Sequence, residues 1–326
     1  MSNHPALRAV NLVKTYPGKP PVRALDGLSV QVAAGTVVGL LGPNGAGKST
    51  TVKILTTLSR ADSGTAEVAG LDVARHPDQV RRTIGLVSQK SSSDPMATGR
   101  ENLVLAGRLQ GMSGRDARRR AGEMLDRFRL GDAADRLARS YSGGMARKLD
   151  VAIGLMHRPA VLFLDEPTTG LDPEARAEMW AEIQRLATGA DTGEPTTVLL
   201  TTHYLEEADR LADRLAIVDH GRVVVEGSPE ELKSALRGDR VRVDLVDKAD
   251  ADRAAPILGK VDGVSFPTVE GASLLARADN GAAAVPAAVA ALDDAGVPVA
   301  SVTVARPSLD DVYLSQVGRT YQEDQR

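Results

Sequence analysis

One glycine-rich segment constrains the fold of this chain more than any other stretch. The pattern G-x-x-x-x-G-K-[ST] is met by the segment of Gly42, Pro43, Asn44, Gly45, Ala46, Gly47, Lys48, Ser49 and Thr50. An apolar run at residues 37–41 precedes it, and a helix-compatible run at residues 51–55 follows it. Glycines let several backbone N–H groups point into one concavity, and the following helix adds the positive end of its dipole. The segment therefore predicts a phosphate-binding loop between a strand and a helix.

Two side chains of this loop predict a nucleotide with its metal ion. Lys48 is expected to reach the β- and γ-phosphates of ATP, and the hydroxyl of Ser49 is expected to bind Mg²⁺. A glycine-rich turn with a chance lysine is the alternative interpretation. The strand–loop–helix context favours nucleotide binding.

A second signal lies where the apolar run at residues 161–164 ends in two adjacent carboxylates, Asp165 and Glu166. Asp165 is expected to hold Mg²⁺ directly or through water, and Glu166 to lie beside the γ-phosphate and polarise the attacking water. By itself the pattern also fits a strand followed by a charged turn. Combined with the phosphate loop, it predicts nucleotide hydrolysis.

A third signal is the small-residue segment Ser142, Gly143 and Gly144, which precedes a helical run at residues 145–156. Small residues before a helix can seat an anion. A plain loop with an N-cap is the alternative, and the position of the segment between the two ATP motifs favours the anion site.

Composition restricts the class of protein. The 326 residues suffice for two domains, and the chain has no cysteine, which permits a cytosolic location. No apolar run is long enough to span a bilayer, and the first residues lack the apolar stretch of a signal peptide. The net charge of −3 and an aromatic content of 3% argue against a nucleic-acid binder. The basic run Arg115, Arg118, Arg119 and Arg120 is expected to be the solvated face of a helix.

The order of expected elements predicts two domains, at residues 1–238 and 239–326. In the first, strands alternating with helices predict an α/β core with its ligand at the carboxyl ends of parallel strands. Strands at 7–13 and 22–32 suit a small antiparallel sheet, and residues 99–156 suit a helical subdomain. Further strands are expected at 36–41, 84–88, 161–165, 196–201 and 214–219, and helices at 173–187 and 205–211. In the second, the order βαββαβ predicts a small α+β, ferredoxin-like domain, and a last helix is expected at 309–317.

Together these motifs identify a resemblance to the nucleotide-binding subunits of ABC transporters, over residues 6–236. The phosphate loop matches Walker A, the run ending in Asp165 matches Walker B, and residues 141–145 match the signature motif. Three further positions match the Q-loop, the D-loop and the switch histidine of that family, and one the aromatic residue that stacks on adenine: Gln89, Asp172, His203 and Tyr16. The implied fold is a P-loop NTPase core with antiparallel and helical subdomains.

The resemblance implies a head-to-tail homodimer that encloses two ATP molecules. Ser142 and Gly144 would contact the γ-phosphate of the partner's ATP, and Gly143 belongs to the same cofactor-binding segment. Glu166 would be the general base, and His203 would bond the γ-phosphate and orient Glu166 and the water. The resemblance also implies that Gln89 senses Mg²⁺ and the water, that Asp172 orders the dimer interface, and that Tyr16 stacks on adenine.

Two departures from the usual signature motif are Tyr141 in place of leucine and Met145 in place of glutamine. With residues 98–103 and 307–314, they resemble the drug-resistance branch, typified by daunorubicin/doxorubicin efflux ATPases. That branch implies an ATPase subunit of an exporter, bound peripherally to the cytoplasmic face of the cell membrane through a separate integral membrane permease. The segment 89–103 is expected to form the groove for that permease.

Two other classes remain as alternatives. A soluble ABC ATPase acting on ribosomes or nucleic acid usually carries two tandem ATP modules or a long coiled-coil insertion, and the chain shows neither pattern. A phosphate-loop kinase has no use for the segment 142–144. The βαββαβ domain is expected to regulate or stabilise the dimer.

Overall fold

A computed structural model of the chain describes residues 5–190, 193, 195–236 and 238–318. They divide into two compact units, the first ending at Pro229 and the second covering Glu230–Gly318. The sequence pattern changes near Gly238, whereas the second unit begins at helix α8 (Pro229–Ala235), which lines a cavity together with Asp239 and Arg306. The ends of both expected domains, residues 1–4 and 319–326, lie outside the described residues. Among the described residues, no helix combines the length and apolar character needed to cross a membrane.

The main sheet of the first unit has six strands in the order β10-β9-β3-β8-β7-β6. Five of them are parallel, and β10 runs antiparallel to β9. The strands are β3 (Val37–Leu41), β6 (Ile84–Val87), β7 (Val161–Asp165), β8 (Thr197–Thr202), β9 (Arg214–Asp219) and β10 (Arg222–Gly227). The central strands are buried on both faces, which explains why they read as continuous apolar runs in the sequence.

A second, antiparallel sheet of this unit has the order β2-β1-β4-β5. Its strands are β1 (Leu7–Tyr16), β2 (Val22–Val32), β4 (Ser63–Val68) and β5 (Leu71–Asp72). Strands β4, β5 and β10 are not expected from the sequence. The burial pattern of β4 explains this, because only two of its six residues are buried and its pairing partner, β1, lies far away in the chain.

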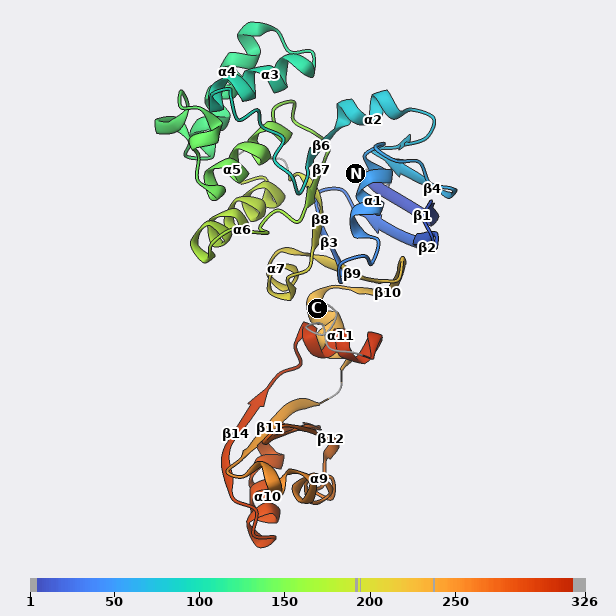
Figure 1. Cartoon of the computed structure of the whole chain (residues 1–326), viewed down its shortest axis with the longest axis vertical. Helices are drawn as coiled ribbons and strands as arrows, with labels where there is room; N and C mark the ends of the chain where they lie inside the picture. Colours follow the sequence, from blue (N-terminus) through green and yellow to red (C-terminus); the bar gives the residue numbers. More distant parts are fainter. Residues whose placement is uncertain (1–4, 191–192, 194, 237, 319–326) are drawn as a thin grey trace. The chain divides into compact units, whose positions relative to one another are not determined.

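Helices cover both faces of the parallel sheet. Helix α1 (Lys48–Leu55) lies between this sheet and the antiparallel sheet, and α3 to α6 lie on the opposite side (Figure 1). The remaining helices of this unit are α2 (Pro77–Thr83), α3 (Gly99–Leu109), α4 (Gly114–Arg127), α5 (Gly143–Gly154), α6 (Pro173–Thr188) and α7 (Leu205–Leu211). Helices α3, α4 and α5 occupy the stretch for which a helical subdomain is expected.

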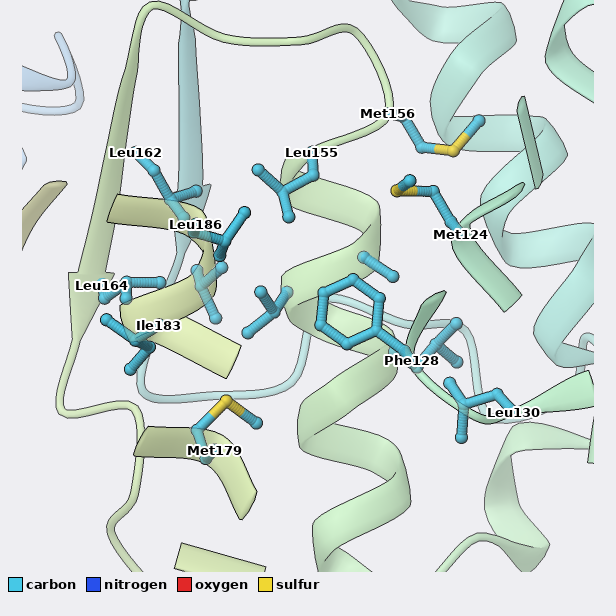
Figure 2. Packing of buried hydrophobic residues seen from close by; sticks show 14 of the residues in the cluster. Met124, Phe128, Leu130, Leu155, Met156, Leu162, Leu164, Met179, Ile183 and Leu186 are labelled. Carbon is cyan, nitrogen blue, oxygen red and sulfur yellow. The ribbon is translucent and has the colours of Figure 1, made fainter. Parts of the chain in front are cut away.

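Alternate residues of the central strands enter two separate cores. Val161 and Phe163 of β7 pack with α1 and the antiparallel sheet, whereas Leu162 and Leu164 pack with the helices on the other face. Figure 2 shows Leu162 and Leu164 among side chains of the helical side, including Ile183, Leu186 and Leu155. Because successive side chains of a strand point to opposite faces, the same sheet contributes to both cores.

One expectation about α4 is wrong. Arg115, Arg118 and Arg119 are exposed, but Arg120 is only 8% exposed. Its guanidinium donates to the carbonyls of Leu155 and Met156, at 3.2 and 3.3 Å, just beyond the end of α5. Carbonyls at a helix C-terminus lack intrahelical donors, so a buried arginine is retained there.

The second unit has a four-stranded antiparallel sheet in the order β12-β13-β11-β14. Two helices pack on one face of it, and a third follows the last strand. The elements after α8 are β11 (Asp239–Leu245), α9 (Ala251–Leu258), β12 (Val264–Glu270), β13 (Ser273–Ala278), α10 (Gly281–Asp294), β14 (Val299–Ala305) and α11 (Leu309–Val317). The expected βαββαβ order is therefore present, and Ser308 caps α11.

Candidate functional site

The candidate site forms where four parallel strands end at the same edge of the sheet. Leu41 at the end of β3 pairs with Thr202, and Asp165 at the end of β7 pairs with Thr201. Strand β6 pairs with β7 up to Val87. The segments that follow these strands carry the phosphate loop, Gln89, Glu166 and His203. Residues distant in the chain are thus brought together at the carboxyl edge, where open α/β sheets bind ligands.

Tight packing requires the glycines of the phosphate loop. A Cβ on Gly42 would lie 2.2 Å from the carbonyl oxygen of Val218. A Cβ on Gly47 would lie 2.6 Å from the carbonyl of Ala24, and φ of Gly47 is 110°. Gly45 also has a positive φ, of 83°, and Ala46 is buried. The loop backbone therefore approaches its neighbours more closely than residues with side chains allow.

Lys48 is the first residue of α1 and is only 4% exposed. Its ammonium group donates to the carbonyls of Gly42 and Pro43, at 2.6 and 2.9 Å. Burial lowers the pKa of Lys48, and the nearby carboxylates of Glu166 and Asp165 counteract this effect. A buried cation beneath a loop at a helix N-terminus suits a phosphate group.

The carboxylate of Asp165 lies directly beside the loop. Ser49 Oγ donates to Asp165 Oδ1 at 3.2 Å, and Thr201 Oγ1 donates to the same oxygen at 2.5 Å. Thr201, which is not among the predicted site residues, also accepts a bond from the backbone N–H of Glu166 at 3.1 Å. In the sequence Thr201 is only one hydroxyl residue near the end of an expected strand. The register of β8 against β7 brings it beside Asp165.

Glu166 is the centre of the polar cluster and is 8% exposed. Gln89 Nε2 donates to Glu166 Oε2 at 3.2 Å, Thr169 Oγ1 donates to the same oxygen at 3.3 Å, and His203 Nδ1 lies 3.2 Å from Oε1. His203 is the main cause that lowers the pKa of Glu166, with a further contribution from Lys48, against the effect of burial. The carboxylate is therefore kept ionised and able to accept a proton.

In a single chain, three of the sites predicted from the sequence lie outside the polar cluster around Glu166. They are the segment 142–144, Asp172 and Tyr16. Ser142 caps α5, accepting from the backbone N–H of Met145 at 3.3 Å, and Gly143 and Gly144 begin the helix. Asp172 caps α6 through the N–H of Ala175 at 2.8 Å. Tyr16 ends β1, and the ammonium group of Lys14 lies 5.5 Å from the centre of its ring.

The unusual residues of the signature segment have structural partners. The hydroxyl of Tyr141 donates to the carbonyl of Ala133 at 2.7 Å, and a Cβ on Gly99 would lie 2.1 Å from that hydroxyl oxygen. Met145 packs against the helical core. The tyrosine thus joins the start of α5 to the start of α3, so this departure is part of the packing of the helices.

Comparison with protein families gives two matches on this chain. The family model described as "ABC transporter" matches residues 25–169. The family model described as "ATP-binding protein DrrA1-3-like, C-terminal domain" matches residues 227–317. The first match contains the phosphate loop, Gln89 and Glu166, whereas His203 lies beyond its end. The second covers most of the second unit.

Similar curated proteins extend over nearly the whole chain. The daunorubicin resistance ATP-binding protein DrrA2 of Streptomyces coeruleorubidus is 48% identical over 96% of this chain and 95% of its own length. The doxorubicin resistance ATP-binding protein DrrA of Mycobacterium tuberculosis (strain H37Rv) is 42% identical over 97% of this chain and 95% of its own length.

Among solved structures, the first unit resembles the ATP-binding cassette MJ0796, whose dimer was determined in a post-hydrolysis state bound to ADP and Pi. The TM-score is 0.62 at 27% identity, covering 68% of this chain and 98% of that chain. Together with the family matches, this likeness confirms the fold class expected from the sequence.

Proposed function

Because the chain belongs to the family of ATP-binding proteins of ABC transporters, we propose that it hydrolyses ATP to power the efflux of a drug or another hydrophobic compound through a separate membrane permease. One observation carries the proposal of hydrolysis: the carboxylate of Glu166 lies between Gln89 and His203 at the edge of a phosphate loop. The similar proteins are named for resistance to daunorubicin and doxorubicin, which supports this class of cargo.

In this proposal the backbone N–H groups of the loop and Lys48 hold the β- and γ-phosphates of ATP. Glu166 accepts a hydrogen bond from the attacking water and orients it toward the γ-phosphate. His203, already beside Glu166, donates to the γ-phosphate and keeps the carboxylate in place. Each group acts on charge that develops during phosphoryl transfer, which is where preorganised donors accelerate a reaction.

The donors beside the loop fit Mg²⁺. Mg²⁺ takes oxygen ligands and usually combines one or two protein oxygens with phosphates and water. Ser49 Oγ and Asp165 Oδ1 lie 3.2 Å apart next to the loop and would hold it, with Gln89 as a further contact. When bound, the ion would neutralise charge on the β- and γ-phosphates.

The segment that begins α5 is proposed to complete the site of a second copy. Ser142 and Gly143 are exposed at the N-terminus of this helix, whose dipole favours an anion. In a head-to-tail homodimer they and Gly144 would contact the partner's ATP, with Asp172 ordering the interface and Tyr16 stacking on adenine. The dimeric state of the similar cassette MJ0796 supports this arrangement.

We further propose a peripheral position on the cytoplasmic face of the cell membrane, through binding to the permease. Segment 89–103 is the candidate contact, and Met96 within it is 64% exposed. An action on ribosomes or nucleic acid finds no support in the relatives described above.

The substitution Glu166→Gln tests the function. It should lower kcat for ATP hydrolysis by about 10²- to 10⁴-fold, because the amide cannot accept the proton, while ATP binding and ATP-bound dimers persist. Steady-state hydrolysis and size-exclusion chromatography with Mg·ATP, both with the permease present, measure the two properties. Glu206→Gln is the matched control, because Glu206 is exposed on α7. Wild-type turnover in Glu166→Gln would remove Glu166 from this role, and a wild-type protein that neither binds nor hydrolyses ATP would contradict the function itself.

The second unit is proposed to stabilise or regulate the dimer. It has its own core of small and aliphatic residues around β11, α9 and α10. Deletion of the residues after Gly238 should therefore weaken ATP-dependent dimerisation or assembly with the permease, as measured by size-exclusion chromatography and co-purification. If both remain unchanged, this proposal fails.

A further inference from the structure

Helix α5 carries two buried, charged side chains that face the catalytic segments. Arg147 is 8% exposed and Asp150 is 3% exposed. They are three residues apart, so they project from the same side of the helix. Burial of charge is unfavourable unless hydrogen-bond partners replace the lost hydration. Every nitrogen of Arg147 has an acceptor, and Oδ1 of Asp150 has three donors.

Every nitrogen of the Arg147 guanidinium donates to the backbone of a catalytic segment. Nε donates to the carbonyl of Pro167 at 2.7 Å, and Nη1 donates to that of Ser88 at 2.6 Å. Nη2 donates to the carbonyls of Asp165 and Glu166, both at 3.1 Å. A planar fork with five N–H groups can satisfy four carbonyls at once, whereas the ammonium group of lysine has three donors on a single nitrogen.

The carbonyl of Glu166 needs such a partner because the backbone there is unusual. Its φ is 50°, in the left-handed region that non-glycine residues rarely adopt. Such a conformation persists only when the surroundings hold it. Thr201 binds the N–H of Glu166, and Arg147 binds its carbonyl, so the two side chains fix the residue from both sides.

Asp150 ties down the segment that follows Gln89. Its Oδ1 accepts from Ser91 Oγ at 2.9 Å and from the N–H groups of Ser92 and Ser93 at 2.9 and 3.2 Å. Since Arg147 holds the carbonyl of Ser88, α5 is attached to the chain on both sides of Gln89.

We propose that Arg147 and Asp150 are positioning residues through which α5 places Glu166 and Gln89 for hydrolysis. This inference depends on the proposed function. The N-cap of the same helix is Ser142, where the ATP of a second copy is expected to bind. A displacement of this helix would therefore reach Glu166 of its own subunit.

A matched control exists in the same chain. Arg120 is also 8% exposed and also donates to backbone carbonyls, but its acceptors are Leu155 and Met156, beyond the other end of α5. A purely structural role of a buried arginine predicts the same behaviour for both positions. A positioning role predicts an effect on hydrolysis from Arg147 alone.

The test compares Arg147→Lys with Arg120→Lys in the full chain with its permease. In Arg147→Lys, kcat should fall by about 10- to 100-fold, as expected when a catalytic group is displaced by about 1 Å. The Kd for Mg·ATP and dimer formation with the non-hydrolysable Mg·AMP-PNP should stay at wild-type values, because Lys48 and Ser142 are untouched. Arg120→Lys should keep wild-type kcat, even if it lowers the melting temperature as much.

Wild-type kcat in Arg147→Lys, or an equal fall of kcat in both variants, would overturn the inference. Should Arg147→Lys fail to fold, Asp150→Asn gives the same split, since it removes the charge but keeps the shape: kcat falls and the Kd for Mg·ATP does not change. Unchanged kcat in Asp150→Asn would then overturn the inference. Absence of hydrolysis by the wild type would contradict the proposed function, whereas active wild type with active variants contradicts only the role of α5.

Discussion

The two units of the molecule differ in whether they bury charged side chains. Within the part of the first unit that the structure describes, seven charged side chains are buried: Lys48, Arg120, Arg147, Asp150, Glu166, Glu182 and Glu207. In the second unit, among the residues that the structure describes, the only buried polar side chain apart from Tyr313 is that of Ser273. Its core consists of alanine, valine and leucine side chains.

This difference indicates where the chemistry takes place. Removing a charge from water costs several kcal/mol unless partners replace the lost hydration, so buried charges are retained where they are needed. Lys48, Glu166, Arg147 and Asp150 all contact the segments around the phosphate loop. No charged side chain is buried in the described part of the second unit, so no such desolvation cost has to be offset there. This suits a module that acts through its surface.

One charged network of the second unit lies on the face of its sheet opposite the core formed with α9 and α10. Asp244 accepts from Ser273 Oγ and Ser301 Oγ, both at 2.6 Å, and from Arg242 Nε at 2.8 Å. These groups come from three adjacent strands, β13, β14 and β11, so the network joins the sheet across its strands.

The largest effect is expected when a Cβ is added to a closely packed glycine, and the same change can be made in each unit. Gly42→Ala places a carbon 2.2 Å from a backbone carbonyl in the phosphate loop. Overpacking of this kind costs about 1–3 kcal/mol, so ATP should bind about 10- to 100-fold more weakly. Equilibrium binding of Mg·ATP to the full chain measures the change.

The matched variant in the second unit is Gly281→Ala. Its new carbon would lie 2.4 Å from Val304 Cγ1 and 2.9 Å from Asp239 Cβ. Stability of that unit should fall by a similar amount, but the affinity for ATP should not change. Equal losses of ATP affinity in both variants would show that the two units do not divide binding and packing in this way.

An intermediate effect is expected from a buried acid of the first unit. Glu207 is fully buried, and its Oε1 accepts from Thr168 Oγ1 at 2.8 Å and from Trp180 Nε1 at 3.0 Å. Burial raises the pKa of Glu207, because loss of hydration outweighs these hydrogen bonds. The neutral variant Glu207→Gln should therefore raise the free energy of unfolding at pH 8 by about 1 kcal/mol.

The sign of the pH dependence provides a check on Glu207. The folded protein binds this proton more tightly than the unfolded chain, so the wild type gains stability as the pH falls through the folded pKa. The advantage of Glu207→Gln should thus shrink on acidification, as measured by urea denaturation at pH 8 and pH 5. An advantage that grows at low pH would contradict the assigned cause.

The smallest effect is expected from Asp244, a half-buried acid of the second unit. The hydroxyls of Ser273 and Ser301, and then Arg242, hold the pKa of Asp244 well below its ordinary value. Asp244→Asn should slightly lower the denaturation midpoint of the second unit at pH 7. The difference from the wild type should begin to shrink below about pH 4, the unfolded pKa, and should be lost only as the pH falls through the lower folded pKa of Asp244. A difference that stays the same size from pH 7 to pH 2 would indicate loss of packing instead of charge.

Local patterns in the sequence were sufficient for the elements that position the site. The glycine spacing before Lys48 predicts the loop, and an apolar run that ends in Asp165 and Glu166 predicts a buried strand with carboxylates at its end. These predictions succeed because strand burial and loop conformation depend on neighbouring residues. Strand β4 was not predicted because it is stabilised by pairing with β1. The residues of β4 themselves give little indication of this pairing.

The sequence by itself determined which groups are available for the chemistry, because backbone conformation at the loop and the end of each strand follows from adjacent side chains. Only the tertiary structure decided how these groups are held. Thr201, Arg147 and Asp150 have no distinctive local pattern, and they contact the site through chain segments that are far apart in sequence. Arg147, for example, reaches a carbonyl 59 residues away. Such contacts exist only after the sheet has set its strand order and α5 has packed against it. A list of motifs therefore contains Glu166, the proposed general base, but not the side chains that hold it in place.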